Sequence, residues 1–196
     1  MTLDGALDDA GWRGIPWTAG FRRFLGPEHI IPQRTLVKAA WDDRCLYVAF
    51  RVYDTDSWAT MTARDDRLWE EEVVEIYIDE DDDQLNYREF EINPLGTMLD
   101  ALIPKAGDQR DTHKVRLWNA AGRRAAARPH WVAETAFPWG IFTHAKRLPP
   151  QPGHVWRIQF YRAERERPGS EPIATSWSPT PNFHVPERFG RILFVE

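Results

Sequence analysis

The sequence has very few cysteines and no long apolar run. Its single cysteine, Cys45, excludes an intrachain disulfide and a zinc site built from several cysteines. No run of eighteen apolar residues exists, which excludes a membrane-spanning helix of ordinary length. Basic residues are outnumbered, 25 Lys and Arg against 30 Asp and Glu, and the net charge of -5 is opposite to that of proteins that bind nucleic acid or anionic membranes. We therefore expect neither nucleic acid nor a membrane as a partner.

The N-terminal sequence MTLDGALDDAGW lacks the basic and apolar segments of a secretion signal. We expect either a cytoplasmic protein or a mature form whose signal has been removed, and the localisation stays open. A chain of 196 residues is long enough to bury a core without disulfides or metals. The sequence therefore predicts one domain that spans residues 1–196.

Helical periodicity is also scarce, and apolar residues instead recur with the two-residue period of β-strands. The predicted strands cover residues 35–41, 45–54, 73–79, 87–93, 97–103, 115–118, 130–137, 155–165 and 188–194. Turn-forming sequences such as NPLG and LPPQPG lie between them. The one helical candidate is a single turn at PWGIF, residues 138–142. These patterns predict an all-β fold, an antiparallel β-sandwich or jelly roll with one short helical turn.

The predicted strands present two different faces, because successive residues of a strand point to opposite sides. In residues 73–79, Val74, Ile76 and Ile78 form the predicted core side, and Glu75 and Tyr77 lie on the opposite side. The same rule places on non-core faces Glu89, Glu91, Gln159 and Tyr161. Such a face is either the solvated side of a sandwich or one wall of a groove for a polar ring with apolar faces, such as a sugar. The ten tryptophans could supply core bulk or stacking platforms.

Several segments in order resemble the family 9 carbohydrate-binding modules of the DOMON-like β-sandwich superfamily. They are LDG…W, TLVKAAWDDRCLYVAFRVYDTD, LWEEEVVEIYID, YREFEINPLG, RIQFYRAE and TSWSPTPNFHVPERFGRILF. The resemblance implies a non-catalytic module that binds mono-, di- or oligosaccharides or glycan chain ends, such as those of xylan or cellulose, and serves glycan catabolism. It also implies structural calcium, no organic cofactor, and an extracellular or periplasmic location.

The resemblance implies specific roles for four residues. Trp69 and Trp177 would hold the sugar ring between them, Glu75 would accept hydrogen bonds from hydroxyls, and Gln159 would be a bidentate partner. His184 lies in the same segment as Trp177, where covering the groove is its favoured role. The predicted ligand-binding residues are Trp69, Glu75, Tyr77, Glu91, Gln159, Tyr161, Trp177 and His184. Two positions depart from the family pattern, since Glu91 replaces an arginine and ATS before Trp177 lacks an asparagine.

Calcium is the ion that the acidic segments favour. Asp54 and Asp56 follow a predicted strand, and Asp79 and Asp81 belong to the run DEDDD, so both places offer oxygen ligands without EF-hand spacing. The alternative for DEDDD is a solvated acidic turn that discourages pairing of sheet edges.

Two other functions stay open. Glu89 and Glu91 would lie about 7 Å apart at a strand rise of roughly 3.3 Å per residue, within the range of paired glycosidase carboxylates, whereas Glu75 and Asp79, about 13 Å apart, would not. A haem-binding DOMON-type domain would use Met98 and a histidine, although a strand methionine is typical of a core. Sequence motifs of nucleophile elbows, zinc proteases and phosphate-binding loops are absent, so we expect a binding protein and not an enzyme.

Overall fold

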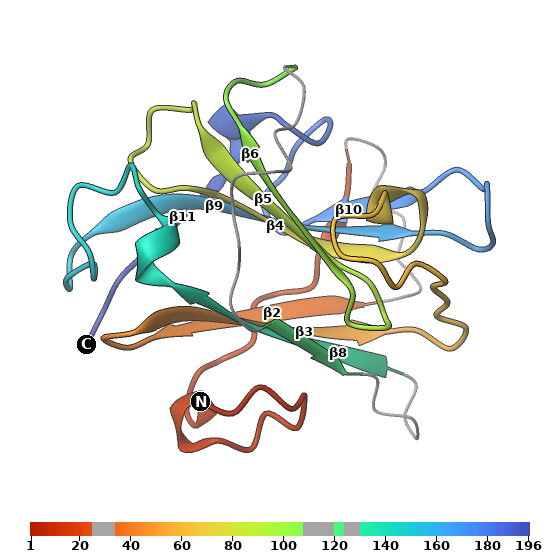
Figure 1. Ribbon diagram of the computed structural model, residues 1–196, viewed down its shortest axis with the longest axis horizontal. Coiled ribbons are helices and arrows are strands. Elements are labelled where there is room, and N and C mark those ends of the chain that lie inside the picture. The colour runs from red at the N-terminus through yellow and green to blue at the C-terminus, as the bar shows by residue number, and fades with distance from the viewer. Residues whose placement is uncertain (25–33, 108–119, 124–129) are drawn as a thin grey trace.

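Two antiparallel β-sheets pack face to face in the computed structural model (Figure 1), as the sequence predicted. The structure describes residues 1–24, 34–107, 120–123 and 130–196. Within these residues, no helix has the length and apolar character that crossing a membrane requires.

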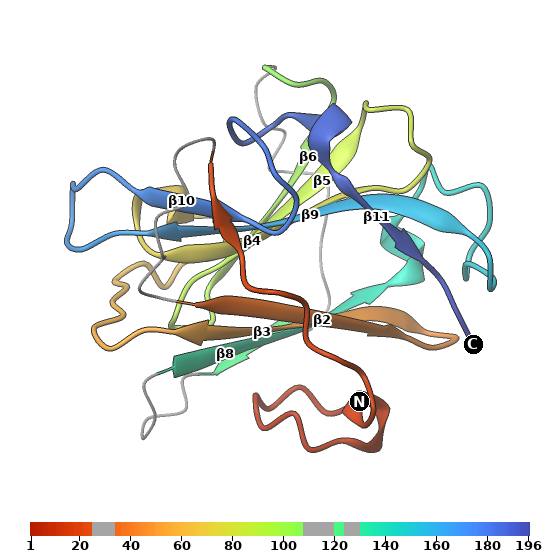
Figure 2. The same cartoon turned by 180° about the vertical axis from the view of Figure 1, so that it is seen from behind.

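The larger sheet, called sheet A, has the strand order β1-β10-β9-β4-β5-β6, with β11 also paired to β9. Its strands are β1 (Arg22–Arg23), β4 (Val73–Asp79), β5 (Tyr87–Ile92), β6 (Met98–Ile103), β9 (Val155–Glu164), β10 (Ile173–Ser176) and β11 (Gly190–Leu193). β11 pairs with the first half of β9 and β10 with the second half. The chain between these two strands, residues 177–189, therefore arches over sheet A (Figure 2).

The smaller sheet, called sheet B, has the order β2-β3-β8-β7. Its strands are β2 (Thr35–Trp41), β3 (Cys45–Tyr53), β7 (Ala120–Arg123) and β8 (His130–Pro138). Four 3-10 turns complete the described elements: η1 (Ala10–Trp12), η2 (Leu68–Glu70), η3 (Trp139–Ile141) and η4 (Pro186–Arg188). The predicted helical turn at 138–142 is confirmed as η3, and the predicted strand at 115–118 lies outside the described residues.

The core between the sheets contains the side chains that strand alternation assigned to it. Val74, Ile76 and Ile78 of β4 pack in one buried cluster with Phe90 of β5 and Phe160 of β9. Their alternate neighbours point to the outer face of sheet A, as expected from the two-residue period. Removing apolar side chains from water contributes ~25 cal/mol per Å² of buried area, so this cluster stabilises the sandwich.

Both outer faces of the sandwich are also covered. Residues 1–17 lie beneath sheet B (Figure 1), where Trp12 packs against Tyr47 and Ala49 of β3. On sheet A, Phe183 and Phe189 pack against the outward tyrosines of the strands. The sequence indicated either a solvated face or the wall of a groove here. The structure differs, because the outward side chains of β4 and β5 are buried.

Candidate functional site

Three glutamates gather on the outer face of sheet A. Glu75 of β4 faces Glu91 of β5 across the strand pair, and Glu89 lies opposite Tyr77. Carboxylate oxygens of the three glutamates lie within 4.8 Å of one another, and each residue is at most 3% exposed. The Tyr77 hydroxyl donates to Oε1 of Glu89 at 2.9 Å. The sequence pattern predicted this shared face, and the register brings the carboxylates together.

Aromatic rings surround these carboxylates. Tyr161 of β9 lies opposite Glu75 in the sheet, and its ring centroid is 4.9 Å from that of Tyr77. Phe183 packs on Tyr161 with 5.0 Å between ring centroids. Burial, followed by the nearby charge of Glu75, raises the pKa of Tyr161, so its hydroxyl stays neutral. The site therefore combines hydrogen-bond acceptors with apolar ring surfaces.

His184 covers two of these tyrosines. Its imidazole lies 2.9 Å from the hydroxyl of Tyr87 and 3.4 Å from that of Tyr77, each measured from a ring nitrogen. The residue adopts a positive φ of 53°, which is uncommon for a side chain larger than glycine. His184 thus occupies a cover position over the acidic face.

Gln159 holds the main chain of the covering segment. Its Nε2 donates to the carbonyl oxygen of Ser178 at 2.9 Å, and its Oε1 accepts from the Ser178 N–H at 2.9 Å. Oε1 also accepts from the N–H of Phe160. The predicted role of Gln159 as a bidentate sugar partner differs from this placement, because both polar atoms already bond to the protein.

The two tryptophans predicted to hold a sugar lie against different clusters. Trp69 packs, half-buried, with the outer-face residues of sheet A, and the Arg67 guanidinium lies 5.7 Å from its ring centroid. Trp177 packs with the core between the sheets, 5.5 Å from Phe160 between ring centroids. The backbone N–H of Trp177 donates to the carbonyl oxygen of Phe160, which extends the pairing of β10 with β9 by one residue. The Trp177 side chain therefore points to the core between the sheets. The structure therefore does not bring the two indoles together.

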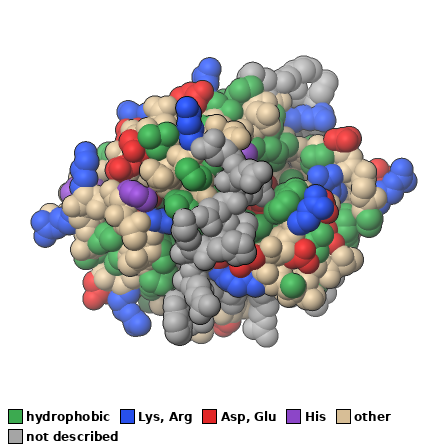
Figure 3. Space-filling model, turned by 45° about the horizontal axis from the view of Figure 1, so that its top comes forward, with side chains coloured by type: hydrophobic (Ala, Val, Ile, Leu, Met, Phe, Trp, Pro, Cys, Tyr) green, Lys and Arg blue, Asp and Glu red, His purple; other side chains and the backbone are tan. Residues whose placement is uncertain are grey.

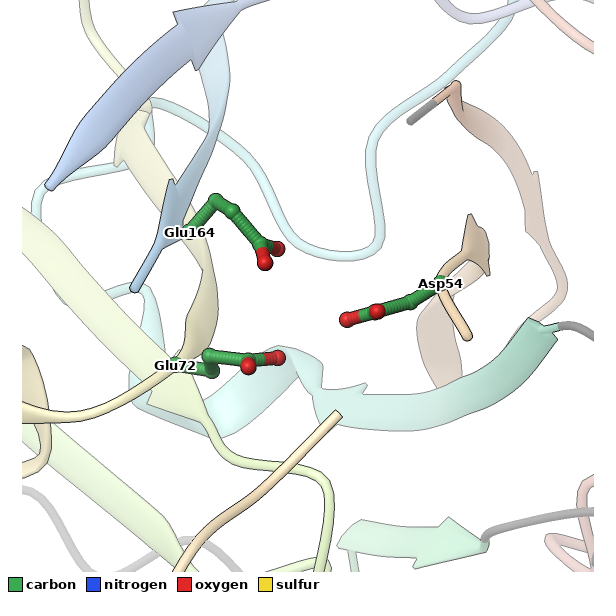
Figure 4. Close-up of side chains that lie close together, drawn as sticks. All are labelled: Asp54, Glu72 and Glu164. Atoms are coloured by element: carbon green, nitrogen blue, oxygen red, sulfur yellow. The ribbon is translucent and has the colours of Figure 1, made fainter. Parts of the chain in front are cut away.

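A second acidic cluster joins the ends of three strands. Figure 4 shows Asp54, Glu72 and Glu164 pointing toward one another, from the ends of β3 and β9 and from the residue before β4. Oxygens of the three carboxylates lie within 4.8 Å of one another. Arg162, 2% exposed, donates from Nη2 to Asp54 at 2.9 Å and also bonds to Glu164. Three potential negative charges thus share one buried guanidinium.

Glu72 is the member of this cluster whose carboxylate is least satisfied by hydrogen bonds among the described residues. Its Oε1 accepts from the N–H of Trp58 at 3.3 Å, but in the part of the chain that the structure describes no donor reaches its buried Oε2. Burial, followed by repulsion from Glu164, raises the pKa of Glu72 to about 9. A calcium ion would fit this site, since hard oxygen ligands suit it and its two charges with that of Arg162 would balance three carboxylates.

The other predicted calcium ligands lie elsewhere. Asp56 is exposed and donates its N–H to Oδ1 of Asp54 at 3.0 Å, outside the cluster itself. Asp79 and Asp81 do approach Asp83, but both carboxylate oxygens of Asp79 accept backbone N–H groups of the hairpin. The run DEDDD is thus organised by its own hydrogen bonds. Glu72 and Glu164 were missed because only the pairing of β4 with β9 brings them together.

The surface over sheet A carries charges of both signs. Figure 3 shows acidic and basic side chains interspersed with apolar ones on this face of the molecule. Such mixing produces no large field of one sign on the part of this face that the described residues form. Recognition at this face would depend on shape and hydrogen bonds more than on long-range attraction.

The two-sheet antiparallel sandwich is a fold that known carbohydrate-binding modules also have. The chain belongs to carbohydrate-binding family 9, whose model matches residues 29–194. Its fold is similar to that of a protein from Bacteroides uniformis, with a TM-score of 0.74 and 20% identity over 92% of this chain and 87% of that one.

A family 9 carbohydrate-binding module from Caldicellulosiruptor kristjanssonii has the same fold at 17% identity. Its structure in complex with cellotriose has a TM-score of 0.73 and covers 100% of this chain and 89% of that one. Its structure in complex with glucose has a TM-score of 0.73, with 98% and 90% covered. No curated protein matches the chain significantly.

Proposed function

We propose that the protein binds saccharides without cleaving them, at the outer face of sheet A. The observation that carries this proposal is the cluster of Glu75, Glu89 and Glu91 beside Tyr77 and Tyr161, in a chain of carbohydrate-binding family 9. Carboxylates accept strong hydrogen bonds from hydroxyl groups, and aromatic rings pack against the C–H faces of a pyranose. Glu75 would anchor the sugar and Trp69 would flank it.

The first ligands to test are neutral glucose units. The related module from Caldicellulosiruptor kristjanssonii was solved with cellotriose and with glucose, which supports β-linked glucans and their ends as the ligand class. A role in glycan catabolism is part of this proposal.

Sugar binding would require movement of the covering segment. Glu75, Glu89 and Glu91 are at most 3% exposed, and Phe183 and His184 cover the neighbouring tyrosines. A ligand that reaches the carboxylates must displace part of this cover, so association would be slower than for an open site. The half-buried Trp69 and His184 would mark the entrance.

A hydrolase fits the geometry less well. Oxygens of Glu89, Glu91 and Glu75 lie within 4.8 Å of one another, which is too close for the water that inverting glycosidases hold between carboxylates ~6.5–9.5 Å apart, although near the ~5–5.5 Å of retaining ones. Both Glu89 and Glu91 are fully buried, so a glycosidic bond could not lie between them as they stand. The haem alternative has no support from Met98, which packs in the core between the sheets.

We propose in addition that Asp54, Glu72 and Glu164 hold a structural calcium ion. The buried Oε2 of Glu72 and the excess of carboxylates over Arg162 support this site more strongly than the DEDDD hairpin. The ion would fix the ends of β3, β4 and β9 and would supply no chemistry to bound sugar.

Isothermal titration with glucose, cellobiose and cellotriose tests the sugar proposal. We expect Glu75→Gln and Trp69→Ala to lower affinity at least tenfold, about 1.4 kcal/mol, while the exposed Glu171→Gln binds as the wild type does. Equal affinities for wild type and Glu75→Gln would contradict the site. Shorter products after long incubation with cellotriose would contradict the non-catalytic role.

A further inference from the structure

A cleft of about 460 Å³ opens beside Trp58, outside the acidic face of sheet A. Its walls come from the loop after β3, the η2 turn and the turn after β9, and include Trp58, Thr60, Glu70, Arg165 and Pro168. This volume lies within the range of about 300–1,000 Å³ that small-ligand sites occupy. None of the residues predicted to bind sugar lines it.

Residue Trp58 is held by two hydrogen bonds, one from its backbone and one from its indole ring. Its backbone N–H donates to Oε1 of Glu72 at 3.3 Å, and its Nε1–H donates to the carbonyl oxygen of Arg165 at 2.6 Å. The ring's only polar group is therefore satisfied inside the protein, and the half-buried side chain presents apolar carbon to the cleft. A ring held in this way stacks on a ligand without losing rotamer freedom.

The walls beside this ring are equally fixed. Glu71, 4% exposed, accepts hydrogen bonds from the N–H of Thr60 at 2.9 Å, the N–H of Met61 at 3.1 Å and the hydroxyl of Thr60. On the other side, the guanidinium of Arg165 donates to the carbonyls of Ser170 and of Trp69. Both charged groups are thus used to shape the cleft.

The groups left for a ligand are uncharged or negative. The Thr60 hydroxyl donates to Glu71 and keeps its acceptor capacity, and Glu70 presents a carboxylate whose exposed partner is Arg67. An apolar ring face beside two acceptors suits a neutral, hydroxyl-rich ring, while the carboxylates of Glu70 and Glu71 disfavour an acidic sugar.

We propose that this cleft is a second saccharide subsite, in which a neutral pyranose stacks on Trp58 and donates hydrogen bonds to Thr60 and Glu70. The ligand class rests on the proposed function, whereas the location rests on the cleft alone. Because the carbonyl of Trp69 bonds to Arg165, the subsite adjoins the entrance proposed for the acidic face. One glucan chain could therefore occupy both places, and longer chains would bind more tightly than glucose.

Indole 1H–15N spectra during titration with cellotriose test the proposal directly. Trp58→Phe identifies the Trp58 signal, and the same titration is repeated in Glu75→Gln, where the acidic face is impaired. Trp41→Phe identifies a control signal, because the half-buried Trp41 also donates from Nε1 to a carbonyl, that of Val195. Trp41 is the last residue of β2 and pairs with Leu46 near the start of β3, whereas Trp58 lies in the loop after the end of β3. We expect a saturable shift of Trp58 in both proteins, no shift of Trp41, and no shift of Trp58 with a galacturonic acid trimer.

The outcomes separate the two proposals. If Glu75→Gln weakens cellotriose binding while the Trp58 signal never moves, the acidic-face site stands and the subsite is overturned. If cellotriose causes neither heat nor any indole shift in the wild type, both proposals fail. Equal shifts of Trp41 and Trp58 would indicate a general change and would also overturn the subsite. Trp58→Ala and Glu70→Ala should each weaken cellotriose binding about two- to tenfold and leave glucose affinity nearly unchanged.

Discussion

The side-chain amide of Gln159 forms two hydrogen bonds with the main chain of Ser178, one to the carbonyl oxygen and one from the N–H, each 2.9 Å long. This pair fastens the beginning of segment 177–189 to β9. The segment then places Phe183 and His184 over the outer face of sheet A. The amide of Gln159 therefore holds the beginning of the covering segment in place.

Replacing this amide with a carboxylate should loosen the cover. In Gln159→Glu, one oxygen still accepts from the Ser178 N–H, but the other faces the Ser178 carbonyl oxygen and loses a donor. We expect the free energy of unfolding to fall by about 1–3 kcal/mol, because buried polar groups lose their partners. Urea denaturation measures this, with the exposed Gln151→Glu as a control near zero. A wild-type midpoint for Gln159→Glu would contradict the role.

Gly190 makes room for the indole of Trp177. A Cβ atom at position 190 would overlap the six-membered ring of Trp177, whereas one at Gly140 meets nothing within 4 Å. We expect Gly190→Ala to destabilise the protein by about 1–3 kcal/mol through overpacking, and Gly140→Ala to be nearly neutral. In a Trp177→Leu background the cost of Gly190→Ala should fall below about 0.5 kcal/mol. Additive effects in this double-mutant cycle would show that the two residues do not compete for space.

Glu134 anchors the N-terminal segment under sheet B. Fully buried on β8, its carboxylate accepts from the N–H groups of Asp4 and Gly5 and from the indole N–H of Trp12, the last at 2.7 Å. Glu134→Ala would leave these donors without an acceptor and should cost about 2–4 kcal/mol.

Limited trypsin digestion provides a local measure of this anchor. Exposed Arg13 lies one residue after Trp12, and we expect cleavage there to accelerate in Glu134→Ala. Glu187→Gln, an exposed acid on η4, should cleave as the wild type does. Unchanged cleavage at Arg13 with a lowered stability would place the damage in β8 and not in the segment.

The strands and the core were predictable because local patterns determine them. Alternation in residues 73–79 separated the core set from the outward set, and both sets lie as expected. β10 was missed, since its four residues, IATS, are too short to show alternation. The direction of Trp177 follows from the pairing of that missed strand with β9, so sequence reasoning had no basis for placing its side chain.

The candidate site was predictable in composition but not in accessibility. Strand parity placed Glu75, Tyr77 and Tyr161 on one face, and the structure brings them together there. Their burial depends on how segment 177–189 packs, which no local pattern specifies. Similarly, Glu72 and Glu164 are far apart in the chain, and only the antiparallel pairing of β4 with β9 brings them together.

Calcium should stabilise the protein through Glu72. We expect saturating calcium to raise the unfolding free energy by roughly 2.7 kcal/mol at a hundred times the dissociation constant, about 5–10 °C in melting temperature, and a chelator to reverse the rise. Glu72→Gln keeps an acceptor for the N–H of Trp58 but loses the charge, so it should abolish the calcium increment. Asp81→Asn, in the DEDDD hairpin, should retain it. Calorimetric scans with and without calcium decide between the clusters, because loss of the increment in Asp81→Asn alone would place the ion in the hairpin.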